Sequence, residues 1–288
     1  MPTILKVRAP GKINLALQVL RKRDDGFHEI RSLMVSVGLA DVVIVETLPY
    51  NNIEVTCDTP NVPCDPSNLA FRAAENLKRH TGVKTGCHIH LVKRIPVGAG
   101  MGGGSSDAAA TMIALNRLWR LGWSRARLAE VGAEIGSDIP FFFWPSGARV
   151  YGRGECIKPT TMTWRGFAGL VSSGDHVSTV EVYKRCTPRD TPDNLQAIAS
   201  ANSSTEIAPQ LCNDLEASVF EVAPRVREMR DALIESKIAS DNIRVTGAGS
   251  VLFELFDDRS EADAFVERAR KCPLVASSWV VAIPAPPA

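Results

Sequence analysis

Residues 95–110 read Ile-Pro-Val-Gly-Ala-Gly-Met-Gly-Gly-Gly-Ser-Ser-Asp-Ala-Ala-Ala, and this glycine-rich stretch is the most distinctive feature of the sequence. Before it, residues 87–93 alternate apolar and polar side chains, which is typical of a strand. After it, the alanine-rich run from Ser105 to Trp119 predicts a helix that begins near Ser105. Glycines let backbone N–H groups converge on one point, and a helix N-terminus adds free donors and partial positive charge. A strand, loop and helix in this order predict a phosphate-binding site.

The loop differs from the two common glycine-rich nucleotide motifs. A Walker loop ends in Gly-Lys-Ser/Thr, whereas this loop ends in Gly104-Ser105-Ser106. The spacing of Gly98, Gly100 and Gly103 matches a Rossmann fingerprint, but residues 119–123 lack the acid expected about 20 residues later. The remaining alternatives are a flexible glycine linker or glycines needed only for tight packing. Such linkers rarely separate a clean alternating strand from a strongly helical segment.

Composition narrows the class of protein. The 288 residues are 45% hydrophobic, enough for a core in two modest domains or one large domain. Lys and Arg number 33 against 32 Asp and Glu, so the net charge of +1 gives no reason to expect a nucleic-acid or membrane partner. Seven cysteines without Cys-x-x-Cys spacing favour reduced thiols. With no signal peptide and no run of roughly 20 apolar residues, we expect a cytoplasmic protein.

Hydrophobic periodicity predicts an α+β protein with a domain boundary near residue 158, giving domains at 1–158 and 159–288. The first domain has predicted strands at 13–19 (half-buried), 41–46, 53–57 and 87–93, and helices at 67–80, 105–119 and 124–135, each starting at a serine. The second has a strand at 167–172, a helical region at 214–237, strands at 243–246 and 251–256, a helix at 260–271 opened by a Ser260/Asp263 capping box, and a strand at 280–283. This order is ferredoxin-like. The polar, proline-containing residues 187–205 predict a surface excursion.

Three short motifs are weak when each is taken alone. Residues 9–15, Ala-Pro-Gly-Lys-Ile-Asn-Leu, place Lys12 and Asn14 at the start of a strand, where a lysine is usually solvated. Residues 136–142, Gly-Ser-Asp-Ile-Pro-Phe-Phe, place Asp138 before an apolar run, as a helix cap or a functional group. Residues 246–250, Thr-Gly-Ala-Gly-Ser, favour a hairpin turn.

Residues 10–14, the glycine-rich loop and residues 246–250, in this order, resemble the motifs of the superfamily of galactokinase, homoserine kinase, mevalonate kinase and phosphomevalonate kinase. Three further blocks narrow the resemblance to one family, the 4-diphosphocytidyl-2-C-methyl-D-erythritol kinases of the non-mevalonate isoprenoid pathway. They are Asp-Gly-Phe-His-Glu-Ile-Arg-Ser at 25–32, the Asp138 block and Asn-Asp-Leu-Glu at 213–216. The matches span roughly residues 9–256.

The resemblance implies a fold and a reaction. The N-terminal domain would resemble the second domain of ribosomal protein S5, the C-terminal domain would be ferredoxin-like, and the active site would lie between them. ATP, with Mg²⁺, would donate its γ-phosphoryl group to the 2-hydroxyl of a small-molecule acceptor, a cytidine diphosphate sugar alcohol. The protein would act as a monomer or homodimer.

The resemblance also implies roles for residues at the ATP end. Asp138 would be the general base, and Lys12 beside it would keep that carboxylate ionised and stabilise developing charge. The adenine would lie near Asn68 and, more loosely, Lys93 or Arg94. ATP binding is assigned to Asn68, Pro96, Val97, Gly98, Ala99, Gly100, Met101, Gly102, Gly103, Gly104, Ser105 and Ser106. No metal ligand is identified, although Ser105 and Ser106 are candidates.

At the acceptor end, the resemblance assigns substrate binding to five residues: Asn14, Phe27, His28, Thr179 and Tyr183. His28 would read the cytosine edge, while Phe27 and Tyr183 would sandwich the ring. Asn14 and Thr179 would contact the methylerythritol or diphosphate part. Phe27 stands where many family members have Tyr, so stacking is kept and a phenol contact is lost.

Two alternatives stay open. Another kinase of the superfamily, acting on mevalonate or homoserine, would share the loop but not the block at 25–32. A non-catalytic nucleotide- or RNA-binding protein is conceivable because the S5-like fold also occurs in the ribosome. The near-neutral charge and the Lys12/Asp138 pair argue against that second alternative.

Overall fold

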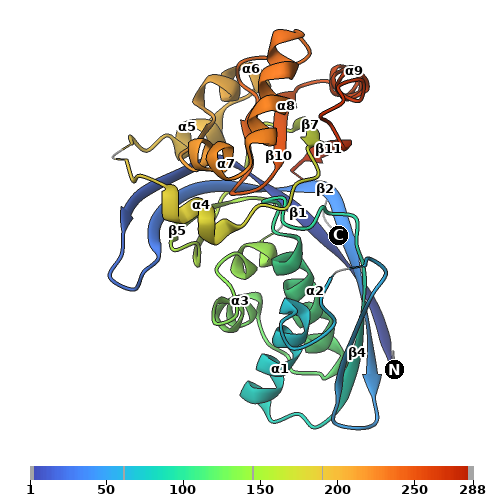
Figure 1. Cartoon of the computed structure of the whole chain (residues 1–288). Coiled ribbons are helices and arrows are strands. Elements are labelled where there is room, and N and C mark those ends of the chain that lie inside the picture. Colours follow the sequence, from blue (N-terminus) through green and yellow to red (C-terminus); the bar gives the residue numbers. More distant parts are fainter. Residues whose placement is uncertain (1–2, 61, 145, 190, 285–288) are drawn as a thin grey trace.

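The computed structural model describes residues 3–60, 62–144, 146–189 and 191–284, which form two β-sheets flanked by helices (Figure 1). In these residues the first sheet has seven strands, in the order β3-β4-β2-β1-β8, with β5 paired to β2 and β6 to β5. The strands are β1 (Ile4–Lys22), β2 (His28–Leu48), β3 (Ile53–Cys57), β4 (Gly86–Val92), β5 (Ala148–Gly152), β6 (Cys156–Pro159) and β8 (Cys212–Asn213). β1 and β2 far exceed the predicted strands at 13–19 and 41–46, because they pair with each other almost from end to end.

β1 corrects the prediction of a half-buried strand. Its apolar face, with Ile13 and Leu15, enters a core shared with the second sheet, where Leu170 and Phe253 meet it. Its polar face is buried as well, since Lys12 is only 3% exposed. A buried polar face needs partners, and those partners lie in the cavity described below.

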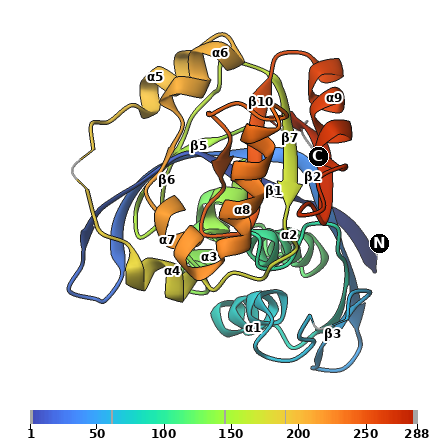
Figure 2. The same ribbon diagram turned by 45° about the horizontal axis from the view of Figure 1, so that its top comes forward.

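Helices cover the other face of the first sheet, as Figures 1 and 2 show for the group α1, α2 and α3. They are α1 (Leu69–Thr81), α2 (Gly103–Leu118), α3 (Arg125–Ala133) and the 3₁₀ turn η1 (Ile139–Phe143). The predicted cap of α3, Ser124, is confirmed, since its side chain accepts a hydrogen bond from the N–H of Arg127. The predicted starting serines of the other two helices are wrong, by one residue for α1, whose N-cap is Asn68 and not Ser67, and by three for α2, whose N-cap is Gly102 and not Ser105. Asn68 caps α1 through the N–H of Ala70, and α2 begins directly after Gly102.

The second sheet has the strand order β11-β7-β10-β9, which confirms the ferredoxin-like prediction and the α+β class. Its strands are β7 (Gly166–Ser172), β9 (Arg244–Val245), β10 (Val251–Phe256) and β11 (Ser277–Ile283). The helices around it are α4 (Thr179–Arg185), α5 (Leu195–Ser200), α6 (Ser204–Ile207), the 3₁₀ turn η2 (Ala208–Gln210), α7 (Glu216–Val222), α8 (Pro224–Glu235) and α9 (Arg259–Ala269). β9 and β10 form the predicted hairpin around residues 246–250.

Three predictions for this half need correction. The helical region at 214–237 is two helices, because Pro224 opens α8 and cannot continue α7. Asp258, not a Ser260/Asp263 box, caps α9 by accepting from the N–H of Ser260 at 2.6 Å. The predicted surface excursion at 187–205 contains α5, whose Leu195 and Ile198 are fully buried.

The two halves are joined by more than a linker. β6 ends at Pro159 in the first sheet and β7 begins at Gly166 in the second, but β8 returns to pair in parallel with β1. The domain boundary near residue 158 therefore stays a prediction. Within the described ranges, none of the helices has the length and apolar character needed to cross a membrane.

Candidate active site

A cavity of about 1060 Å³ lies among the glycine-rich loop, β1, the turn before η1 and α4. It gathers nearly all of the residues that the sequence predicts for the site. Those that line it are Lys12, Asn14, Phe27, His28, Asn68, Pro96, Val97, Gly98, Ala99, Gly100, Met101, Gly102, Gly103, Gly104, Ser105, Asp138, Thr179 and Tyr183. Ser106 is not among them.

The glycine-rich loop has the backbone that its sequence requires. Gly98, Gly100 and Gly102 have φ of 70°, 77° and 69°, in the left-handed region that residues with a side chain rarely adopt. Gly102 is the N-cap of α2, and the first residues of that helix line the cavity. Free N–H groups and the positive end of the helix dipole therefore face the cavity, which suits an anion.

Ser106 and Asn68 have structural duties. The N–H of Ser106 already donates to the carbonyl of Gly102 at 2.9 Å, inside the helix. Its hydroxyl is buried and lacks a hydrogen-bond partner among the described residues. The Asn68 side chain caps α1 and donates to the carbonyl of Pro63 at 2.6 Å. Asn68 can still contact a nucleotide from the cavity wall, whereas Ser106 is poorly placed to do so.

The buried polar face of β1 is a connected hydrogen-bond chain. Nζ of Lys12 donates to Oδ1 of Asn14 at 2.6 Å, and Nδ2 of Asn14 donates to Oγ of Ser32 at 2.8 Å. The Ser32 hydroxyl in turn donates to the carbonyl of Ala16 at 2.6 Å. The N–H of Asn14 also donates to Oγ1 of Thr246 at 3.1 Å. Every link fixes the next, so the ammonium has a defined place in the cavity wall.

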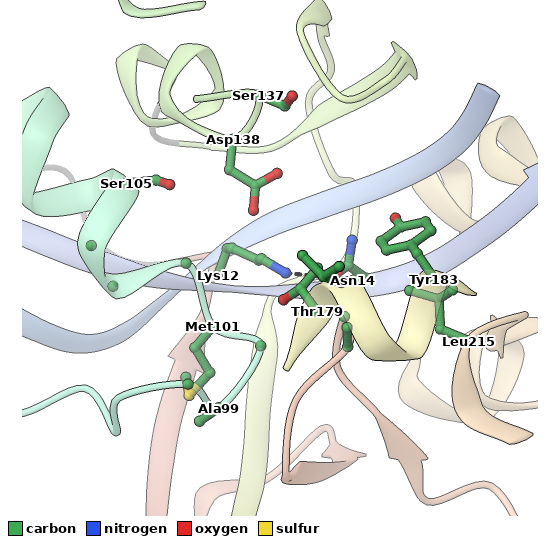
Figure 3. Close-up of a pocket in the computed structure, with 18 of the residues that line it drawn as sticks. Lys12, Asn14, Ala99, Met101, Ser105, Ser137, Asp138, Thr179, Tyr183 and Leu215 are labelled. Atoms are coloured by element: carbon green, nitrogen blue, oxygen red, sulfur yellow. Dashed lines mark hydrogen bonds between the residues drawn. The ribbon is translucent and has the colours of Figure 1, made fainter. Parts of the chain in front are cut away.

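Asp138 approaches the same place from another element. It is the N-cap of η1, yet its carboxylate accepts no capping hydrogen bond from the described residues of that turn. Figure 3 shows it facing the cavity, near Lys12 and the hydroxyl of Ser105. Burial lowers the pKa of Lys12 below its ordinary value, while the charge of Asp138 acts in the opposite direction. The cavity thus holds a carboxylate that no helix cap uses and a dehydrated cation.

The aromatic end of the cavity combines β2 and α4. The rings of His28 and Tyr183 lie 5.3 Å apart at an angle of 30°, and Phe27 is 49% exposed. Burial, and to a smaller extent Lys22, lowers the pKa of His28, which favours the neutral form of the imidazole. Burial raises the pKa of Tyr183, and the charge of Asp138 adds to that shift. The Asp138 charge therefore reaches both Lys12 and Tyr183.

Sequence reasoning missed three cations at this end, Arg153, Lys22 and Lys184, which follows Tyr183 on α4. Arg153, on the turn between β5 and β6, lies over the ring of Phe27 with its Cζ 5.0 Å from the ring centroid. Lys22, at the end of β1, also lines the cavity. Arg153 belongs to no recognisable motif. The hairpin β5–β6 brings it to Phe27, and the local sequence does not reveal this contact.

A buried ionic triad closes the base of the glycine-rich loop. Nζ of Lys93 contacts the carboxylates of Asp41 and Asp107, and Oδ1 of Asp41 accepts from the N–H groups of Arg94 and Ile95. Burial lowers the pKa of Lys93, but Asp107 and Asp41 outweigh it and raise that pKa. Burial raises the pKa of Asp107 to about 7, against the opposing effect of Lys93. Lys93 and Asp107 line the cavity, whereas Arg94 does not.

Domain-level comparison agrees with this architecture. The family model described as "GHMP kinases N terminal domain" matches residues 68–145, and "GHMP kinases C terminal" matches residues 192–273. A crystal structure of homoserine kinase from Cytophaga hutchinsonii covers 98% of this chain and 95% of its own, with a TM-score of 0.75 and 16% identity. At that identity the likeness shows the fold alone.

Closer relatives share much more sequence. The 4-diphosphocytidyl-2-C-methyl-D-erythritol kinase of Gloeobacter violaceus is 38% identical over 270 residues, which cover 90% of this chain and 88% of the relative. The protein of the same name from Brevibacillus brevis is 40% identical over 257 residues, which cover 87% of each chain. A crystal structure of 4-(cytidine 5'-diphospho)-2C-methyl-D-erythritol kinase covers 98% of this chain and 100% of its own, with 31% identity and a TM-score of 0.80. Such identity across most of both chains shows that the chain belongs to the 4-diphosphocytidyl-2-C-methyl-D-erythritol kinase family.

Proposed function

We propose that this chain transfers the γ-phosphoryl group of ATP to the 2-hydroxyl of 4-diphosphocytidyl-2-C-methyl-D-erythritol, a step of the non-mevalonate isoprenoid pathway. One observation carries the proposal. A single cavity joins a glycine-rich loop at a helix N-terminus to the His28/Tyr183 ring pair, with Lys12 and Asp138 drawn between Ser105 and Tyr183 (Figure 3). One cavity therefore combines a loop suited to phosphate, a carboxylate near an ammonium, and aromatic rings that can stack on a nucleobase. This combination suits phosphoryl transfer to a nucleotide-linked alcohol.

The transfer needs alignment more than covalent chemistry. The acceptor oxygen forms a bond to the γ-phosphorus as the bond from that phosphorus to the bridging oxygen breaks, and the electron pair leaves on ADP. The carboxylate of Asp138 takes the hydroxyl proton, and the ammonium of Lys12 stabilises the charge that spreads over the transferring group. The dehydration that lowers the pKa of Lys12 also strengthens its field at the reacting atoms.

The acceptor end selects the cytosine by hydrogen bonding and stacking. A neutral imidazole offers one donor and one acceptor, and the lowered pKa of His28 keeps both available. Cytosine presents an N4 amino donor that the acceptor nitrogen of His28 would bind. The exposed face of Phe27 and the ring of Tyr183 offer stacking surfaces, worth about 1–3 kcal/mol for each base. Asn14 and Thr179 are assigned to the sugar alcohol or the diphosphate.

Magnesium fits the oxygen donors of the cavity. The Ser105 hydroxyl is a ligand of the kind that Mg²⁺ accepts. In the described ranges no group of three or more His, Cys, Asp or Glu side chains could hold a metal ion, so the nucleotide phosphates would supply most ligands. When bound, the ion neutralises phosphate charge. A cytoplasmic location and a monomeric or homodimeric state stay predictions.

The deciding experiment offers the purified chain ATP with one acceptor at a time. The acceptors are 4-diphosphocytidyl-2-C-methyl-D-erythritol, mevalonate and homoserine, and the measurements are ADP release and the ³¹P spectrum of the product. We expect a phosphate monoester on the cytidine substrate only. Phosphorylation of mevalonate or homoserine instead would assign the chain another acceptor. If no acceptor of the three caused ADP release, kinase activity on this class of alcohol would be refuted.

A further inference from the structure

One residue of the motif Asn-Asp-Leu-Glu at 213–216, Leu215, lines the cavity. The polar side chains of the motif make their contacts elsewhere. Nδ2 of Asn213 donates to the carbonyl oxygens of Val245 and Gly247, at 2.8 Å each. Oδ1 of Asn213 accepts from the N–H of Leu215 at 3.0 Å, which fixes the orientation of the amide. Both amide hydrogens of Asn213 therefore hold the turn between β9 and β10.

The acidic residues of the motif complete the attachment. Oε2 of Glu216 accepts from the N–H of Val245 at 2.9 Å, on the strand that leads into the turn. Oδ2 of Asp214 accepts from the N–H of Val19 at 2.8 Å, and the N–H of Asp214 donates to the carbonyl of Leu17 at 2.9 Å. The motif thus links the glycine turn of the second sheet to β1, the strand that carries Lys12.

The glycine turn is wedged against the catalytic residues. A Cβ added to Gly247 would lie 2.9 Å from Nζ of Lys12, and one added to Gly249 would lie 1.8 Å from the carbonyl carbon of Ala99. Approaches this close admit backbone only. The same turn presents Oγ1 of Thr246 to the N–H of Asn14.

The contact between the turn and the glycine-rich loop is reciprocal. A Cβ added to Gly100 would lie 2.1 Å from the carbonyl oxygen of Thr246 and 2.7 Å from the nitrogen of Gly249. The turn therefore backs the loop and Lys12 at once. A displacement of the turn would move both the phosphate seat and the ammonium.

We propose that Asn213 is a positioning residue, which holds the 246–249 turn so that the turn fixes the glycine-rich loop and Lys12 relative to each other. The inference rests on the proposed function and adds a residue that touches neither the nucleotide nor the acceptor. Misplacement of catalytic groups by about 1 Å can lower rates by about 10²-fold. A substitution at Asn213 that displaces the turn can therefore lower the rate although Asn213 contacts neither substrate.

The test replaces Asn213 with aspartate, which has the same shape but, when ionised, lacks donors and faces two carbonyl oxygens. The matched control is Asn202→Asp, the same change at an exposed position in the same half of the chain. For Asn213→Asp we expect ATP affinity and kcat each to fall by at least about 10-fold, with a smaller loss of affinity for the cytidine acceptor, which the turn reaches through Asn14. Asn202→Asp should match the wild type. ATP titration, acceptor titration without nucleotide, and steady-state kinetics measure these quantities.

Two outcomes would overturn the inference. If Asn213→Asp kept the ATP affinity and kcat of the wild type, the 246–249 turn would not depend on the hydrogen bonds of Asn213 for its position. Equal losses of ATP and acceptor affinity would indicate general loosening instead of positioning. If the wild type fails to phosphorylate the cytidine acceptor, the proposed function fails, whereas the ATP titration still tests Asn213.

A second pair of variants covers the case in which Asn213→Asp does not fold. Glu216→Gln keeps an oxygen acceptor for the N–H of Val245, and Glu216→Met has similar length without that acceptor. We expect Gln to retain ATP affinity and kcat, and Met to lose both by about 10-fold, with a smaller loss of acceptor affinity. Equal behaviour of the Gln and Met variants would contradict the brace.

Discussion

Nζ of Lys12 lies 2.6 Å from Oδ1 of Asn14, two residues away on the same buried face of β1. The other end of the Asn14 amide donates to Ser32, so the oxygen must face Lys12. The amide oxygen of Asn14 takes the place of water as a hydrogen-bond partner of the buried ammonium. Burial lowers the pKa of Lys12, so keeping this side chain charged in the folded state costs free energy.

Lys12→Met should separate activity from stability. We expect turnover to fall by at least about 10²-fold, because the cation at the transferring group is lost. At neutral pH the variant should be at least as stable as the wild type, since methionine has no charge to bury. The lowered pKa of Lys12 makes the folded state lose this proton before the unfolded state does, so wild-type stability relative to the variant should rise as pH increases toward 10.5. Thermal unfolding at several pH values checks this, and a large loss of stability at neutral pH would contradict it.

Asp138→Asn should stop proton removal and leave the nucleotide seat intact. We expect turnover to fall by at least about 10²-fold with ATP affinity nearly unchanged. The measurements are steady-state kinetics and equilibrium titration with ATP. Ser137→Ala is the control, because this neighbour also lines the cavity but carries no carboxylate. Near-normal turnover in Asp138→Asn would remove Asp138 from the role of general base.

His28 should make acceptor binding sensitive to acid. Its pKa lies below 6.5, so the ring gains a proton only when the pH falls below that value. Protonation converts the acceptor nitrogen into a donor that opposes the cytosine amino group. We therefore expect the KM for the acceptor to rise on acidification while the KM for ATP does not follow it. His28→Gln, which keeps a donor and an acceptor without titrating, should flatten the acceptor profile; an unchanged acid limb would show that another group titrates.

Asp107 should impose a pH dependence on folding. Its pKa is raised from 3.8 to about 7, so between these values the folded state binds this proton more tightly than the unfolded state. The contribution of Asp107 to stability is therefore fully present below about 3.8 and is lost as pH rises toward about 7. Asp107→Asn should remove this slope, which thermal unfolding of both proteins across that range would reveal. Asp263→Asn, on the exposed side of α9, should keep the wild-type slope.

Local features of the chain were readable from the sequence. The glycine-rich loop and the cap of α3 by Ser124 depend on neighbouring residues, and the ferredoxin-like order of strands and helices along the second half follows from the periodicity of each segment. The structure contains all three. The roles of Lys12, Asp138, His28 and Tyr183 came from resemblance to a family, since nothing in their local sequence indicates that distant elements meet. The structure lines one cavity with them, and their chemical roles remain predictions.

Non-local packing explains what the sequence did not reveal. β1 and β2 extend each other by pairing, which residue periodicity within either strand cannot show. α5 carried a usable signal, the apolar spacing of Leu195, Ile198 and Ala199, but polar neighbours and Pro192 concealed it. Arg153 reaches Phe27 only through the hairpin β5–β6.

The pairing of β1 with β2 has a consequence for how the chain can change in length. The register shifts on both sides of a short block in which Lys12, Ile13 and Asn14 pair without interruption. Because side chains alternate between faces, deletion of one residue just before this block would exchange the faces, placing Ile13 in the cavity and the ammonium in the core. The turn between β1 and β2, at residues 23–27, has no such constraint on alternation. We expect insertions and deletions between Pro10 and Ala16 to abolish activity, because they exchange the two faces of β1. In the turn at 23–27 they leave this alternation unchanged, but they move Phe27 and the adjacent His28 and should therefore weaken acceptor binding. The uninterrupted alternation of one strand thus keeps the ammonium in the cavity.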